Sequence, residues 1–173
     1  MYKRQLLDLG HASAVLVGGY HGAWIPAGQA ARLTLSNSSL RPHGAFTGAG
    51  VLAALPAGRC GLAESAGVST YLALESAGQC GPCRSGLPSI AAAMTELAGP
   101  HPDPRALADL TRWAGLVERR GACHHPDGTV RFLRSALCVF ADEVGRHRQG
   151  LCSGADERAF LPAPAARPDW GRP

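Results

Sequence analysis

The sequence is poor in aromatic residues, has Lys3 as its single lysine and lacks any long apolar run. Aromatic side chains make up 6% of the 173 residues, while 22 glycines and 13 prolines indicate many loops and tight packing of small side chains. No stretch reaches the roughly 18 apolar residues that span a bilayer, and the N-terminus does not follow the order of a signal peptide. We therefore expect a cytoplasmic protein without membrane insertion.

The charge pattern is not that of a nucleic-acid-binding protein. A net charge of +4 comes almost wholly from scattered arginines, and no basic face is interleaved with aromatic residues. The sequence therefore predicts no nucleic-acid binding. A nucleotide-binding glycine loop is also missing, because Gly44, Gly48 and Gly50 precede an apolar stretch and open no helix.

The first third of the chain has the pattern of a small β domain. Apolar runs at 14–20 and 51–56 and the alternating segment 32–36 predict three short strands, joined by connectors rich in Gly, Ser, Asn and Pro. Three strands without a full set of partners indicate only part of a β domain, which we place at residues 1–58.

From Gly61 onward the apolar period changes from 2 to 3.6. The predicted helices cover 62–76 and 87–97, then a segment that starts at Asp103-Pro104 and is capped by Gly121, then one that enters after Asp127-Gly128 and reaches Val144. Four helices with short loops predict a helical bundle over 59–149, and 150–173, with few apolar anchors, predict a mobile tail. The fold class expected for the whole chain is α+β.

Cysteines carry the clearest chemical signal. Six cysteines in a chain without a secretion signal favour metal, cluster or buried thiols over disulfides. Cys80 and Cys83 precede the second predicted helix and Cys123 precedes the fourth, where helix N-termini stabilise thiolates. A Cys-x-x-Cys pair followed by a cysteine about 40 residues later fits an iron–sulfur cluster better than zinc. A zinc site and a pair of idle cysteines remain the alternatives.

Residues 75–86, ESAGQCGPCRSG, resemble a segment of a known family. The flavoprotein (NADH-binding) subunit of respiratory NADH:quinone oxidoreductase and related bacterial dehydrogenases shows Glu-Ser-Cys-Gly-x-Cys-x-Pro-Cys-Arg-x-Gly, in its C-terminal part. The matching positions here are Glu75, Ser76, Gly78, Cys80, Pro82, Cys83, Arg84 and Gly86. Cys123 stands where the family has its fourth ligand, and Phe140 with Glu143 match the Phe-x-x-Glu of its last helix. Upstream, AVLVGGYHGAWIP resembles the ligand-binding β-grasp domain of the same subunits.

This resemblance implies an iron–sulfur electron-transfer module: a partial β-grasp unit followed by a four-helix iron–sulfur-binding bundle. Its cluster, [4Fe-4S] in the family, would be held by Cys80, Cys83 and Cys123 and would relay electrons from a flavin bound elsewhere to a ferredoxin-like partner. The family's FMN- and NADH-binding domain has no counterpart here, so we expect the chain to bind neither FMN nor NADH and to be inactive alone. A cluster-less structural or docking subunit is the alternative.

Ala77 departs from the family pattern, because it occupies the position of the first thiolate and cannot ligate iron. The candidates for a fourth ligand are Cys60, His124 and His125. Cys60 is separated from the cysteine turn by a helix of about 20 Å, and two adjacent loop histidines are more often solvated. A three-iron cluster needs no fourth ligand. The remaining polar candidates are assigned to other roles: Cys138 to the apolar core, Cys152 to the tail, and Asp142 and Glu143 to a solvated face.

Overall fold

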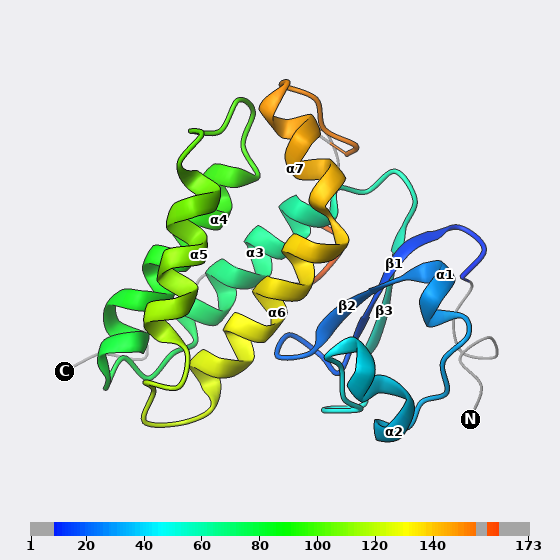
Figure 1. Ribbon diagram of the computed structural model, residues 1–173, viewed down its shortest axis with the longest axis horizontal. Helices are drawn as coiled ribbons and strands as arrows, with labels where there is room; N and C mark the ends of the chain where they lie inside the picture. The colour runs from blue at the N-terminus through cyan, green and yellow to red at the C-terminus, as the bar shows by residue number, and fades with distance from the viewer. Residues whose placement is uncertain (1–8, 155–158, 163–173) are drawn as a thin grey trace.

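The computed structural model describes residues 9–154 and 159–162, and these form an α+β structure. A small three-stranded sheet lies beside a block of longer helices (Figure 1). The strands are β1 (Ala12–Val17), β2 (Ala23–Pro26) and β3 (Leu52–Pro56). The helices are α1 (Ala27–Ala30), α2 (Asn37–Leu40), α3 (Gly61–Leu74), α4 (Leu87–Leu97), α5 (Ala106–Val117), α6 (His125–Val139) and α7 (Ala141–Arg148), with a 3₁₀ turn at Arg41–His43 and a π-helical turn at Pro82–Gly86.

The sheet has the order β2-β1-β3, with both pairs antiparallel. Successive side chains of a strand point to opposite faces, and in β1 both faces are buried. Leu16 belongs to the core shared with the longer helices, whereas Val15 and Val17 pack with Ile25 and Leu40 near α1 and α2. The helices on both sides therefore cover this small sheet.

Two of the three predicted strands are confirmed and one is wrong. Run 51–56 contains β3, and run 14–20 overlaps β1, which begins two residues earlier. Gly18 and Gly19 make the turn after β1 with positive φ angles of 94° and 82°. Segment 32–36 is not a strand, because Ser36 caps the short helix α2 through its hydroxyl. The strand that sequence patterning missed is β2, which has only four residues and ends at Pro26.

Trp24 of β2 joins the sheet to the longer helices. Its indole Nε1–H donates to Ser65 Oγ on α3 at 3.0 Å, and its backbone N–H donates to Ser135 Oγ on α6 at 2.9 Å. The side chain is 2% exposed and packs edge-to-face on Phe140, with ring centroids 5.2 Å apart. This one residue therefore fixes the position of the sheet against two helices.

The first two long helices confirm the predicted boundaries to within two residues, while the later two need correction. Helix α5 begins at Ala106 because the side chain of Asp103 accepts from Arg105 N–H in a preceding turn, and it ends at Val117, short of Gly121. The fourth predicted helix is two helices, because Phe140 has φ −107° and ψ 29°. A Cβ on Gly61 would overlap the Phe140 ring, so the break accompanies a close approach of α3.

Part of the predicted tail is attached to the helices. Glu64 on α3 accepts the backbone N–H groups of Phe160 and Leu161 at 2.7 and 2.9 Å, and Leu161 is 5% exposed. Residues 155–158 and 163–173 of the predicted tail, and Lys3 at the other end, lie outside the described residues. Among the described helices, none combines the length and apolar character that a membrane span requires.

Candidate metal centre

The predicted cysteine turn connects the end of α3 to the start of α4. Gly78 has a φ angle of +68°, which favours glycine, and lets the chain reverse after α3. Cys80 then opens the π-helical turn, where its carbonyl accepts from Arg84 N–H at 2.9 Å. Single π-helical turns occur often at functional sites because they displace side chains from the regular helical spacing. Here the turn contains Cys83.

The loops that contain the three predicted cysteines lie at one end of the longer helices, but among the described residues the three sulfurs do not form a group as compact as the one around Cys60. The loop before α6, which contains Cys123, lies at the same end as the loop between α3 and α4 (Figure 1). The backbone N–H of Ala122 hydrogen-bonds the Cys80 sulfur, and this bond together with Cys83 lowers the pKa of Cys80. Burial raises the pKa of Cys83 to about 11, with further contributions from Cys80 and Cys123. The thiols of Cys80 and Cys123 therefore both lie close enough to Cys83 to affect its pKa.

Exposure differs among the three thiols. Cys83 is 5% exposed, Cys80 is partly exposed and Cys123 is exposed. The backbone beside Gly81 borders open space, because a Cβ at that position would meet no atom within 4 Å. The site therefore has an inner side formed by the protein and an outer side open to solvent.

The histidines next to Cys123 have different environments. The side chain of His124 is fully exposed, with Nδ1 3.9 Å from Asp127 Oδ2. His125 instead donates through Nε2 to the carbonyl oxygen of Leu72 at 2.9 Å and packs edge-to-face on His21. Its Nε2 is thus engaged in joining α6 to α3. Ala77, at the position of the missing thiolate, is exposed in the loop after α3.

Cys60 belongs to a different cluster. It lies at the opposite end of α3 from the cysteine turn, where it caps that helix. Its sulfur, the carboxylate of Glu143, the imidazole of His147 and the sulfur of Cys152 all lie within 4.8 Å of one another. Sequence reasoning missed this group, although the i,i+4 spacing of Glu143 and His147 is a local signal that both face one side of α7. Glu143 does not belong to a solvated face, because its side chain is only 11% exposed.

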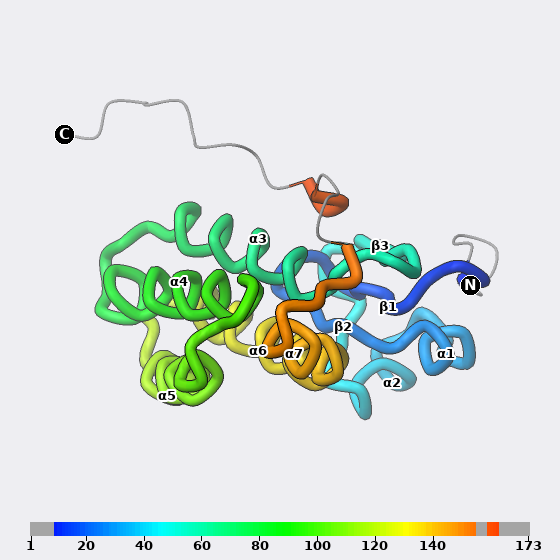
Figure 2. The backbone as a smooth tube through the Cα atoms, turned by 90° about the horizontal axis from the view of Figure 1, so that it is seen from above, coloured from blue at the N-terminus to red at the C-terminus, as the bar shows by residue number. Residues whose placement is uncertain are grey.

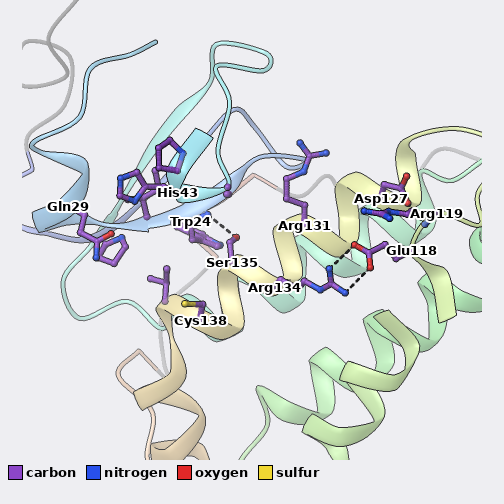
Figure 3. Close-up of a pocket in the computed structure, with 16 residues that line it drawn as sticks. Trp24, Gln29, His43, Glu118, Arg119, Asp127, Arg131, Arg134, Ser135 and Cys138 are labelled. Carbon is purple, nitrogen blue, oxygen red and sulfur yellow. Dashed lines mark hydrogen bonds and ion pairs between the residues drawn. The ribbon is translucent and has the colours of Figure 1, made fainter. Parts of the chain in front are cut away.

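A groove of about 790 Å³ lies between β2 and α6 (Figure 3). It contains Cys138, which is exposed and not part of the apolar core as the sequence had indicated. Arg134 donates to both carboxylate oxygens of Glu118 at 2.7 and 2.9 Å, and the guanidinium of Arg131 stacks over Phe46. Two arginines of the groove, Arg131 and Arg134, therefore have protein partners.

A comparison with known families matches residues 62–147 to the NADH-ubiquinone oxidoreductase-F iron-sulfur binding region. This part of the chain belongs to that family. The match includes Cys80, Cys83 and Cys123 and extends from α3 into α7, and it confirms the predicted relationship to the C-terminal part of the flavoprotein subunit. It also supports an iron–sulfur cofactor. No curated protein matches the chain in a sequence comparison.

Proposed function

We propose that this chain is an iron–sulfur electron-transfer module of an NADH dehydrogenase-like flavoprotein, with its cluster held by Cys80, Cys83 and Cys123. The observation that supports this proposal is that Cys80 and Cys123, from loops about 40 residues apart, are both electrostatically coupled to Cys83 inside the region matched by an iron–sulfur binding family. Thiolates are the usual ligands of such clusters.

As a donor set, Cys80, Cys83 and Cys123 would provide three thiolate ligands for a cluster. Gly81 leaves open space beside the turn, and Ala77 offers no donor atom. This set suits a three-iron cluster, or a [4Fe-4S] cluster whose remaining iron is held by a ligand other than a thiolate of the family motif. When bound, such a cluster supplies one-electron transfer.

The protein's contribution is to set the properties of the sulfur ligands. Burial keeps water from Cys83, and the Ala122 N–H stabilises negative charge on the Cys80 sulfur. Hydrogen bonds to ligating sulfurs, nearby charge and solvent exposure are the variables that tune a cluster's reduction potential. Arg84, exposed in the same turn, adds a positive charge close to the site. This role requires no general acid or base.

The same proposal assigns roles to the rest of the molecule. Residues 1–58 would be a partial β-grasp domain, and 59–149 a four-helix iron–sulfur domain, working in the cytoplasm. Electrons would come from FMN on another domain or subunit, which also binds NADH, and pass to a ferredoxin-like partner. The competing function is a structural or docking subunit without a cluster, favoured by Ala77.

Two cysteine variants test the proposal against this alternative. Cys123→Ser and Cys138→Ser each remove an exposed thiol, but only the first removes a proposed ligand. Protein purified without oxygen is expected to show a broad absorption band near the blue end of the visible spectrum that bleaches with dithionite. Cys138→Ser keeps this band and Cys123→Ser loses most of it. Equal spectra from both variants would exclude Cys123 as a ligand, and a colourless, folded wild-type protein would favour the docking subunit.

A further inference from the structure

The cluster around Cys60 contains four side chains that are typical metal ligands, and they come from three separate parts of the chain. Cys60 lies at the start of α3, Glu143 and His147 lie one turn apart on α7, and Cys152 follows α7. The start of α3 lies beside α7 (Figure 1), and the segment after α7 turns back towards it (Figure 2). The contact between Cys60 and His147, which are 87 positions apart, shows that the fold and not the local sequence builds this group.

The distances suit a tetrahedral zinc ion. Ligand atoms around such an ion stand about 3.4 to 3.8 Å apart, given bonds of about 2.3 Å to sulfur and 2.0 to 2.1 Å to nitrogen or oxygen. His147 Nε2 lies 3.3 Å from Cys60 Sγ and 3.5 Å from Glu143 Oε1. All four ligand atoms lie within 4.8 Å of one another, so small side-chain rotations would bring them to the spacing of a tetrahedral zinc site.

Hydrogen bonds to neighbouring backbone groups orient His147 and Cys60 so that their ligand atoms face the cluster. His147 Nδ1 lies 3.1 Å from the Gly99 carbonyl oxygen, which can only accept, so Nδ1 carries the proton. In the neutral imidazole this leaves the lone pair on Nε2, which faces Cys60. Metal-binding histidines commonly have their second nitrogen bonded to a carbonyl or carboxylate in this way. The Cys60 sulfur in turn accepts from Ala63 N–H at 3.3 Å.

Glu143 is also held in place. Its Oε1 accepts Ser153 N–H at 2.8 Å and its Oε2 accepts the Ser153 hydroxyl at 2.7 Å. Arg146 Nε lies 3.8 Å from Oε2 and offsets part of the negative charge. Because Ser153 follows Cys152, the same contacts position the second thiol. Gly150, at a φ of +73°, lets the chain turn back after α7.

The surroundings favour a closed structural site. Cys60 is 3% and His147 2% exposed, and Cys152 is partly exposed. Sites with four protein ligands of sulfur and nitrogen or oxygen are typical of structural zinc, whereas catalytic sites keep a position for water. Two of the four side chains, Cys60 and Cys152, lie outside the region that matches the iron–sulfur family.

We propose that Cys60, Glu143, His147 and Cys152 bind a structural zinc ion that fastens the start of α3 to α7 and to the segment that follows α7. This site is separate from the cysteine turn, which lies at the other end of α3, about 20 Å away. The proposal does not depend on the iron–sulfur function.

Metal analysis of three variants tests this assignment. We expect about one zinc per chain in protein purified without chelators. Cys152→Ser changes a partly exposed ligand and should reduce zinc to below about a tenth of that amount. Cys138→Ser, an exposed thiol on α6, should keep the zinc. Cys80→Ser should keep the zinc while losing iron, so failure of one metal site is distinguished from failure of the other.

A second measurement keeps the test decisive if Cys152→Ser does not fold. X-ray absorption at the zinc edge of the wild-type protein should show two sulfur ligands at about 2.3 Å and two nitrogen or oxygen ligands at about 2.0 to 2.1 Å. Three results would overturn the proposal: a folded wild-type protein that takes up no zinc when zinc is supplied, unchanged zinc in folded Cys152→Ser, or a Cys60–Cys152 disulfide in mass spectra of alkylated protein.

Discussion

The backbone of Gly86 lies directly against the side chain of Val117. A Cβ built on Gly86 would overlap Val117 Cγ2, and Val117 is 1% exposed in the core. Gly86 ends the π-helical turn that contains Cys83, and Val117 ends α5. This contact therefore sets how closely the cysteine turn packs on α5, whose following loop leads to Cys123.

We expect Gly86→Ala to destabilise the protein and to weaken metal binding at the cysteine turn. Overpacking a filled core costs about 1 to 3 kcal/mol, and relieving the overlap requires the turn and α5 to move apart. Denaturant unfolding and iron content measure the two effects. Gly67→Ala on α3 is the control, because a Cβ there meets nothing within 4 Å. Equal iron and stability in the two variants would show that the contact does not position the site.

Ala77→Cys should restore the ligand that the family motif contains. Ala77 is exposed in the loop after α3, so the substitution is expected to leave folding unchanged. A fourth thiolate favours a complete [4Fe-4S] cluster. Electron paramagnetic resonance distinguishes this product, which is detected after reduction, from a three-iron cluster, which is detected when oxidised. If the variant and the wild type gave the same spectrum, Ala77 would not be the vacant ligand position.

Stability is expected to fall as the pH is lowered through the titration of His21. Burial, then the proximity of His125 and of Arg131, lowers the pKa of His21. The unfolded chain therefore binds more protons than the folded one just below the ordinary histidine pKa of about 6.5, so the stabilising contribution is complete above that pH and is lost below it. His21 is exposed, and screening by solvent makes the effect modest.

Urea unfolding at two pH values, one above and one below 6.5, measures this contribution. His21→Gln should show a smaller difference in unfolding free energy between the two pH values than the wild type. His11→Gln is the comparison variant. A pH dependence unchanged in His21→Gln would contradict the assignment of this titration to His21.

Glu64 should control the attachment of residues 159–162. Hydrogen bonds to a charged acceptor contribute about 1.5 to 3 kcal/mol each, and Glu64 accepts two backbone N–H groups there. We expect Glu64→Ala to raise amide hydrogen exchange at Phe160 and Leu161 by at least about tenfold. Glu118→Ala, which removes an ion pair with Arg134 elsewhere, should not. Equal exchange in both variants would mean that other contacts hold this segment.

Apolar periodicity along the chain predicted the helices that bury a single face. The i, i+3, i+4 spacing of Leu87, Ile90, Ala91 and Met94 predicted α4, and all four are buried as expected. On α3 the spacing of Leu62, Ala66, Thr70 and Leu74 predicts one buried stripe, but Thr70 and Leu74 are exposed and Leu72 is buried instead. Helix α3 is covered on more than one side, so a single stripe does not describe it.

The remaining differences arise from contacts between distant residues. The break between α6 and α7 accompanies packing of Phe140 against Trp24 and Gly61, and no residue near Phe140 indicates it. The cluster around Cys60 likewise joins positions that the sequence separates by most of the helical region. Spacing alone detected the Cys80 and Cys83 pair because these two cysteines are neighbours in sequence.

Iron and acid-labile sulfide per chain, measured in wild-type protein purified without oxygen, test the central claim most directly. A cluster held by Cys80, Cys83 and Cys123 predicts about three to four iron atoms per chain with a matching amount of sulfide. A folded protein that contains neither iron nor sulfide, even after anaerobic reconstitution with both, would contradict it.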